Sequence, residues 1–475
     1  MAWLGLHRPM SAEAGGMVQQ ADRHRMYEAL EVQKLARSLF VGGVEARTAD
    51  QTLALLEDPA CSTIFHALFE TAEFQARVHI LERAGGGRAW DVVLIKSGFS
   101  VKLEYLYELA FALLVMRRAG VMVRKATVLT LSREYLYGDP VEQLFERNDC
   151  TKKVRELVDR FEHGAAGMLQ VLLGAEEPTA TLSRLCRTCG YFDGDCLGRG
   201  VDHSIFELPS LANSRLDYFA ENGIVRLGDI PASVILSGRQ ERVRQAAVSG
   251  ECWFAPELAE GLARLTWPCH YLDFETVTAA LPLYPGCTCH RQLLTQFSIH
   301  SRWSVDGEIA HHEFLADPAR ECERELAEQL IARLGGDEGS IFTYSSFERT
   351  CVKNLGERFP DLEPALRPLR ERMVDLLQMV GDYVYHPAFR GSYSIKSVLP
   401  ALVPDLSYAG MPIADGSTAI MKFAQMARGV ISGDLVEVTR QQLLDYCRMD
   451  TYAMLRVHDV LAHACAGRVA AAGGR

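Results

Sequence analysis

The segment HYLDFET, residues 270–276, predicts a buried β-strand that carries two acids, Asp273 and Glu275. Residues two apart on a strand lie on the same face, roughly 7 Å apart. Both carboxylates therefore point to one place. The fold and the chemistry of the C-terminal half are built outward from this strand.

Two later segments supply the residues that could join these acids. LLDYCRMDT at 443–451 predicts a helix, and its i, i+4 spacing places Tyr446 and Asp450 on one helical face. IFTYSSFE at 341–348 predicts a strand that runs into a helix, with Glu348 at the junction. Four carboxylates and a tyrosine from three segments are what a two-metal phosphodiester cleavage site requires.

The order of elements around these segments predicts a ribonuclease-H-like α/β sheet. We expect three successive strands, a crossover helix and a fourth strand, followed by further helices. The predicted elements are strands at 271–274, 295–302 and 309–315, a helix at 318–334 and a strand at 340–344.

Composition sets limits on these expectations. A chain of 475 residues predicts two or three domains. The hydrophobic content of 48% and charged content of 23% are typical of a globular protein, and the net charge of −11 gives no support to broad nucleic-acid binding. We find no secretory signal and no stretch of about 20 apolar residues, so no membrane partner is expected. The 13 cysteines without an export signal indicate reduced thiols or metal ligands in a cytoplasmic protein.

The rest of the chain divides by pattern. An α/β pattern runs to about residue 150, and a helical, cysteine-marked stretch runs from 178 to 268. We expect a first domain at 1–200, a helical connector at 201–267 and a third domain at 268–465. The elements predicted in the first domain are helices at 23–40 and 101–119 and strands at 74–81, 89–96 and 125–131.

The C-terminal acids and tyrosine resemble the DEDD exonucleases in their tyrosine subtype. The marks are Asp-x-Glu on the first strand, an acid at the start of a mid-domain helix, and Tyr-x-x-x-Asp on the last helix. GSYSIKSVL at 391–399 also resembles the segment that precedes that helix. The resemblance implies a 3′–5′ exonuclease acting on single-stranded DNA or RNA, with two Mg²⁺ or Mn²⁺ ions about 4 Å apart and Tyr446 orienting the attacking water. The residues it assigns are Asp273, Glu275, Glu348 and Asp450 as metal ligands, with Tyr446 beside them.

One position departs from that family. Its middle motif usually carries Asn and Asp, whereas Ser345 and Glu348 stand there in this chain. Glutamate is one methylene longer than aspartate, so the metal spacing can persist. Asp375 is a further acid that we interpret as supporting the site.

The N-terminal part resembles the RecB-like PD-(D/E)XK nucleases, specifically the iron–sulfur exonucleases associated with CRISPR adaptation. The resemblance covers roughly residues 20–200. That site needs an Asp on one strand and Glu-x-Lys on the next. Here His79 and Leu94 stand in place of the acids, while Lys96 is kept. A lysine without either acid does not hold a metal, so we expect a degenerate, catalytically inactive domain.

Three cysteines follow in a C-x₂-C-x₆-C pattern. The same resemblance implies that they bind a [4Fe–4S] cluster with a fourth, early cysteine, because such clusters normally use four thiolates. No cysteine precedes Cys61 in this chain. Either the natural start lies upstream of Met1, or the cluster is lost, or Cys61 or Cys150 substitutes; the pattern is also compatible with a zinc site and with ordinary thiols. The three residues are Cys186, Cys189 and Cys196.

The whole chain resembles a little-characterised bacterial family that joins an iron–sulfur RecB-like domain to a domain of unknown function with a ribonuclease-H-like core. The expected function is that of a metal-dependent exonuclease. The alternative is a non-catalytic nucleic-acid-binding or scaffold protein, in which both nuclease-like sites are degenerate.

Overall fold

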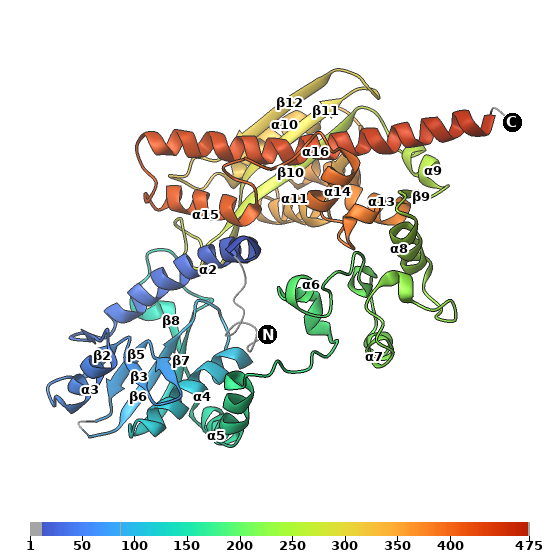
Figure 1. Cartoon of the computed structure of the whole chain (residues 1–475). Helices are drawn as coiled ribbons and strands as arrows, with labels where there is room; N and C mark the ends of the chain where they lie inside the picture. Colours follow the sequence, from blue (N-terminus) through green and yellow to red (C-terminus); the bar gives the residue numbers. More distant parts are fainter. Residues whose placement is uncertain (1–11, 86, 474–475) are drawn as a thin grey trace. The chain divides into compact units, whose positions relative to one another are not determined.

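The structure is a computed structural model that describes residues 12–85 and 87–473, with side chains described at 25–85 and 87–465. The chain forms two compact units, each of mixed α/β structure (Figure 1). The predicted α/β class is confirmed at this level. Within the described residues, no helix carries an apolar stretch long enough to cross a bilayer.

The units are not simple halves of the chain. Unit 1 comprises Met1–Pro178 and Thr278–Gln292, and unit 2 comprises Thr179–Val277 and Leu293–Arg475. The loop at Thr278–Gln292 leaves unit 2 between two of its strands and joins unit 1. The predicted domain boundaries at 200/201 and 267/268 stay a prediction.

Unit 1 is built on a six-stranded sheet in the order β1-β2-β5-β6-β7-β8, with β3 and β4 forming a separate pair. In chain order its elements are α2 (Ala12–Ser38), β1 (Val44–Glu45), α3 (Ala49–Glu57), β2 (Thr63–Phe65), β3 (Leu68–Glu70), β4 (Gln75–Arg77), β5 (Ile80–Arg83), β6 (Trp90–Ile95), α4 (Leu103–Arg118), β7 (Val123–Leu131), β8 (Phe145–Asp149) and α5 (Thr151–Leu173).

Strand β6 explains how this sheet is covered on both faces. All six of its side chains are buried, as expected for a central strand. Val92 and Leu94 pack in the cluster that contains α4, whereas Val93 and Ile95 pack with residues of α2. The sequence pattern at 74–81 predicted one strand; the structure has two, because β4 pairs with β3 while β5 joins the main sheet.

Unit 2 begins with short helices and then forms a five-stranded sheet in the order β12-β11-β10-β13-β14. Its elements are α6 (Phe192–Asp195), α7 (Asn213–Glu221), α8 (Gly238–Ser249), β9 (Trp253–Phe254), α9 (Leu258–Ala263), β10 (Cys269–Thr278), β11 (Gln292–Arg302), β12 (Ile309–Leu315), α10 (Glu323–Leu334), β13 (Ile341–Thr343), α11 (Phe347–Arg358), α12 (Glu363–Glu371), β14 (Met373–Asp375), α13 (Leu376–Tyr383), β15 (Val384–Tyr385), α14 (Ile395–Leu402), α15 (Gly416–Ala427) and α16 (Asp434–Gly473).

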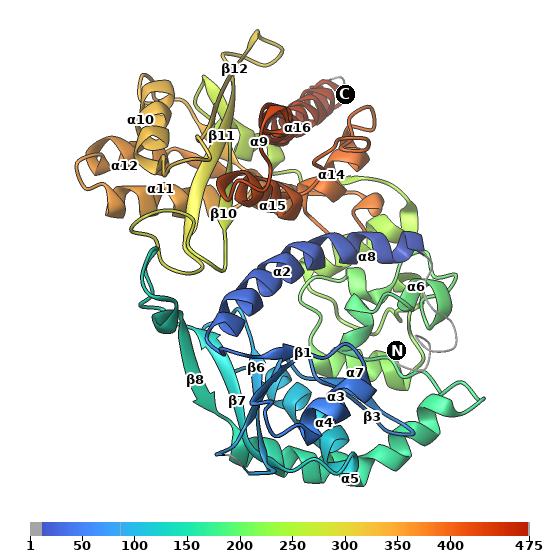
Figure 2. The ribbon, with the colours of Figure 1, turned by 90° about the vertical axis from the view of Figure 1, so that its left-hand side faces the viewer.

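The two faces of this sheet differ in what covers them. Helices α10, α11 and α12 cover one face, and α16 crosses the other (Figure 2). Strand β10 lies between β11 and β13 and runs parallel to β13. Its alternate residues Leu272 and Phe274 join the apolar cluster under α10–α12. Tyr271 faces α16, where its hydroxyl shares a hydrogen bond of 2.7 Å with His458 Nδ1.

Candidate metal centre in unit 2

Strand β10 places its two acids on the face toward α16. Asp273 and Glu275 alternate with the core residues Leu272 and Phe274, so the period of two that buries the apolar pair turns both carboxylates the other way. Because β10 lies inside the sheet, these acids stand over its centre, not at an exposed edge.

Helix α16 brings the second part of the site. Leu443 and Cys447 are buried, and Cys447 Sγ lies 3.5 Å from Asp273 Oδ2. One turn apart on this helix, Tyr446 and Asp450 lie on the side that faces the strand, and burial together with the charge of Asp450 raises the pKa of Tyr446. The predicted strand and helix are both confirmed.

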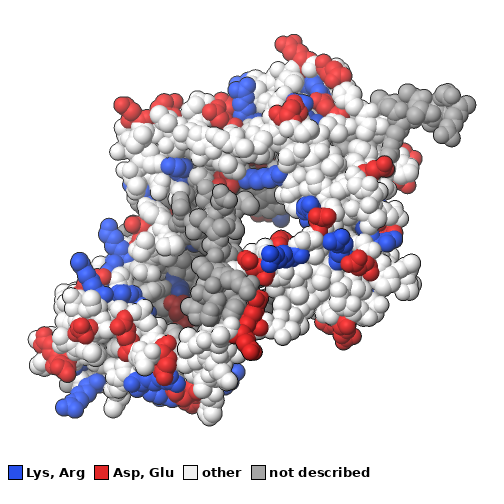
Figure 3. All heavy atoms as spheres, in the orientation of Figure 1, with Lys and Arg blue, Asp and Glu red and all other residues white. Residues whose placement is uncertain are grey.

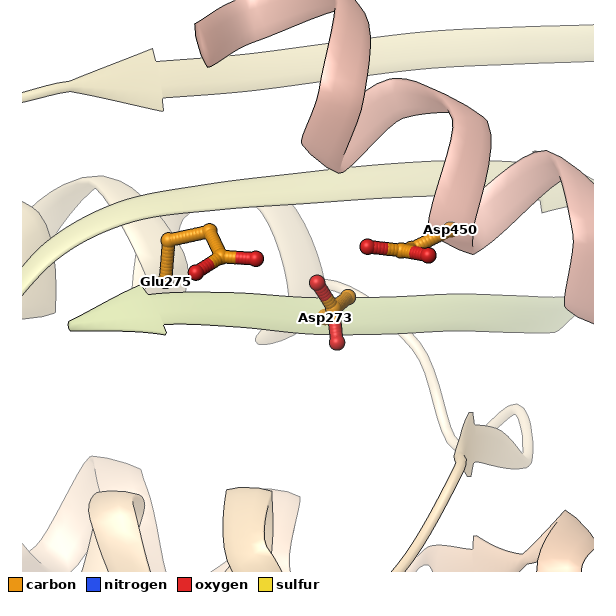
Figure 4. Close-up of side chains that lie close together, drawn as sticks. All are labelled: Asp273, Glu275 and Asp450. Atoms are coloured by element: carbon orange, nitrogen blue, oxygen red, sulfur yellow. The ribbon is translucent and has the colours of Figure 1, made fainter. Parts of the chain in front are cut away.

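Three of the predicted acids meet. Ligand oxygens of Asp273, Glu275 and Asp450 all lie within 4.8 Å of one another (Figure 4). All three carboxylates are partly buried. Among the described residues, these three acids form the group of potential metal-ligating side chains found at that spacing.

Glu348 lies beside this group but outside it. The residue follows β13 at the start of α11, as predicted, and its side chain is 3% exposed. Its Oε2 is buried without any hydrogen-bond partner, and its charge acts on Asp273 and Glu275. A buried carboxylate oxygen without a donor is costly unless a cation neutralises it.

The pKa values of these acids also indicate buried negative charge that no cation compensates. Burial, followed by neighbouring carboxylates, raises the pKa of Asp273 well above its ordinary value and that of Glu275 to about 8. Burial also raises the pKa of Glu348 to about 7 and that of Asp450 to about 6. Desolvation and like charges both disfavour carboxylates, and a bound divalent cation reverses both effects. The donor set fits Mg²⁺ or Mn²⁺, which prefer such oxygen ligands.

Two residues of the site were not predicted from the sequence. The Tyr408 hydroxyl donates a 2.5 Å hydrogen bond to Asp450 Oδ1, and its ring lies 6.3 Å from that of Tyr446. Lys396 lies on α14, and its charge lowers the pKa of both Glu275 and Asp450. The sequence segment at 391–399, which resembles the segment before the last helix of DEDD exonucleases, contains Lys396 and could have indicated it. Tyr408 lies between α14 and α15, and no sequence motif indicated its role.

The supporting acid, Asp375, has a local role. It caps the N-terminus of α13, where its Oδ1 accepts a 3.0 Å hydrogen bond from the Gln378 amide. Its charge also raises the pKa of Glu348. Asp375 therefore adds to the negative potential without being one of the three clustered ligands.

The cysteine segment forms a different part of unit 2. Cys186 and Cys189 line a polar cavity of about 750 Å³, and the Cys186 thiol accepts a hydrogen bond from the Ser183 amide. Cys196 lies at the end of α6. The three sulfur atoms do not come within 4.8 Å of one another as the acids do, in the part of the chain that the structure describes. That spacing applies to a single metal ion and does not test a larger iron–sulfur cluster, so cofactor binding here stays a prediction.

In unit 1, the residues at the positions that correspond to a nuclease site have structural contacts. His79 Nδ1 accepts a 3.0 Å hydrogen bond from the Ile95 amide, and burial lowers the pKa of His79 to about 4. Leu94 is buried in the core. Lys96 Nζ donates to Glu108 Oε2 at 2.6 Å, an ion pair that was not predicted from the sequence.

The comparisons with known proteins include a family that matches part of unit 2. Residues 270–394 match a family described as Domain of unknown function (DUF2779). The matched stretch includes Asp273, Glu275 and Glu348 and ends before Tyr446 and Asp450. No curated protein and no solved structure matches the chain.

Proposed function

We propose that unit 2 is a metal-dependent nuclease that hydrolyses phosphodiester bonds of single-stranded DNA or RNA, acting as a 3′–5′ exonuclease. The observation that carries the proposal is the meeting of Asp273, Glu275 and Asp450 within 4.8 Å, beside the unpartnered Oε2 of Glu348. Three acids held in so small a volume, with a fourth beside them, repel one another unless cations join them.

The strand order supports the ribonuclease-H-like assignment. Numbered by sequence within unit 2, the five strands of the sheet run 3-2-1-4-5, and the acids lie on the first strand at its centre. The outer pair β11–β12 is antiparallel, whereas β10, β13 and β14 run parallel. The order matches the predicted three-strand meander, crossover helix and fourth strand, and β14 is a fifth strand that the sequence pattern did not predict.

In this proposal Asp273, Glu275 and Asp450 hold the divalent ions, with Glu348 completing the set. Bound Mg²⁺ or Mn²⁺ would acidify the attacking water and neutralise charge that develops on the phosphate. Tyr446 serves as a hydrogen-bond donor: burial and the adjacent carboxylates raise its pKa far above the ordinary value, so the hydroxyl keeps its proton. A protonated Tyr446 orients the water and does not act as its base.

Surface charge supports a local mode of substrate binding. The net charge is −11, and the face shown in Figure 3 carries acidic and basic side chains interspersed. Broad phosphate-backbone binding usually uses a basic stripe. We therefore infer that substrate affinity comes from the metal site and the residues next to it.

The proposal gives unit 1 a non-catalytic role as a nuclease-like scaffold. Its support is the burial of Leu94 and the neutral His79 at the two positions where a metal would need acids. We also propose that the cysteine segment binds an iron–sulfur cluster when a fourth ligand joins its three thiols.

A direct test uses single-stranded DNA and RNA oligonucleotides labelled at either end, incubated with the protein and Mn²⁺ or Mg²⁺. Wild type should shorten them from the 3′ end, and Asp273→Ala and Asp450→Asn should each abolish the reaction. Loss of activity on adding a chelator is also expected. If wild type binds oligonucleotides without shortening any of them, the protein is a non-catalytic binding protein. The substitution of the usual Asn and Asp by Ser345 and Glu348 would then explain the missing activity.

A further inference from the structure

Lys396 stands at the rim of the acid group. Its Nζ donates a 2.7 Å hydrogen bond to the Ala414 carbonyl and lies 5.8 Å from the ring centroids of both Tyr408 and Tyr446. Of those two tyrosines, Tyr408 donates a hydrogen bond to Asp450, and Tyr446 lies one turn from Asp450 on α16. The ammonium group is thus fixed next to the α16 side of the site.

Lys396 is also held near Glu275, through its hydrogen bond to Ala414. Ala414 comes two residues before Gly416, which begins α15. A Cβ on Gly416 would lie 4.0 Å from Glu275 Oε2. The hydrogen bond to Ala414 therefore holds Lys396 where its charge reaches Glu275 and Asp450 together, and it lowers the pKa of both.

A cation in this place opposes metal binding. Lys396 and a divalent ion carry like charge and attract the same carboxylates, so the lysine weakens the site for metal in the free protein. The Lys396 side chain is exposed, and an ammonium has three N–H donors, of which Ala414 uses one. Two donors remain for an anion that arrives from solvent.

We propose that Lys396 binds a non-bridging oxygen of the substrate phosphate at the metal centre and is a catalytic residue of the proposed nuclease. The inference rests on the proposed function and deepens it by naming the side chain that recognises the phosphate. A phosphate bound here neutralises the lysine and lies against the acid group that would carry the metals. Lysine suits this role as a compact point charge on a flexible stem.

The test compares Lys396→Met and Lys396→Arg with wild type and with Lys353→Met. Lys353 is an exposed lysine on α11 that pairs with Glu357, so its variant loses the same charge from the same unit. Lys396→Met should slow Mn²⁺-dependent hydrolysis by about 10²-fold, the usual effect of removing one donor to a developing oxyanion. Lys396→Arg should keep part of the rate, and Lys353→Met should keep all of it.

Two binding measurements accompany the kinetics. Calorimetry with Mn²⁺ alone should show tighter binding to Lys396→Met than to wild type, since a competing cation is gone. Calorimetry with a nucleoside 5′-monophosphate in the presence of Ca²⁺ should show weaker binding to the same variant. If Lys396 were only structural, Lys396→Met would lower both the Mn²⁺ affinity and the nucleotide affinity.

The outcomes separate the two proposals. Wild type that cleaves no oligonucleotide contradicts the proposed function. Wild type that cleaves, with Lys396→Met cleaving at the same rate, contradicts only the assignment of Lys396. A fall in Mn²⁺ affinity in Lys396→Met, or unchanged nucleotide affinity, also overturns the assignment. Thermal unfolding of each variant checks that the fold is retained, and partial activity in Lys396→Arg keeps the charge requirement testable if the methionine variant unfolds.

Discussion

Replacing Glu348 with glutamine should stabilise the metal-free protein at neutral and alkaline pH. Burial raises the pKa of this carboxyl from its ordinary 4.5 to about 7. An acid whose pKa is raised on folding destabilises the folded state as pH rises through this interval, because the unfolded chain releases the proton first. The destabilisation is absent below the unfolded pKa and complete above the folded one.

The magnitude follows from the two pKa values. A single group with this shift costs about 1 kcal/mol at pH 5 and about 3 kcal/mol at pH 8. Glu348→Gln removes the charge and keeps the shape, so its free energy of unfolding should exceed that of wild type by about 3 kcal/mol at pH 8 and much less at pH 5.

The assay is urea denaturation with a chelator present at both pH values, followed by circular dichroism. Glu357→Gln is the matched control, since Glu357 lies on the same helix, is exposed and pairs with Lys353. The control should change stability little at either pH. Equal or lower stability of Glu348→Gln at pH 8 would refute the reasoning that Glu348 is an uncompensated buried charge.

Three further changes probe other parts of the account. Tyr446→Phe should lower turnover by about 10²–10⁴-fold while leaving Mn²⁺ affinity unchanged, because the hydroxyl acts on the water; steady-state rates beside Mn²⁺ calorimetry measure both. Tyr408→Phe should lower both metal affinity and rate by about 10–100-fold, since its hydroxyl holds Asp450. Lys96→Ala should leave hydrolysis intact, because Lys96 pairs with Glu108 in unit 1; an inactive Lys96→Ala variant would exchange the roles of the two units.

The central elements of the site could be predicted because local pattern determined them. On β10, apolar and acidic residues alternate, so burying Leu272 and Phe274 fixes where Asp273 and Glu275 point. On α16, the i, i+4 spacing alone places Tyr446 and Asp450 on one side. Neither inference needed knowledge of the rest of the chain.

Other features depended on contacts that local pattern does not encode. Tyr408 lies outside any helix or strand, and only tertiary packing brings its hydroxyl to Asp450. The loop at Thr278–Gln292 follows a strand of unit 2, yet its Ala280 and Cys289 pack in the core of unit 1. At 74–81 the sequence alternates between apolar and polar residues without a break, so it predicted one strand. The chain passes from the β3–β4 pair to the main sheet between β4 and β5, and this alternation does not reveal the change of sheet.

The most direct test of the central claim is calorimetric titration of metal-free wild type and Asp273→Asn with Mn²⁺ at pH 8. The acid group predicts saturable binding to wild type, with proton release from carboxyls such as Glu275, whose pKa is about 8. Asp273→Asn should lose that binding, and Glu357→Gln should keep it. Mn²⁺ binding to Asp273→Asn with the affinity and stoichiometry of wild type would contradict the assignment of Asp273, Glu275 and Asp450 as a metal centre.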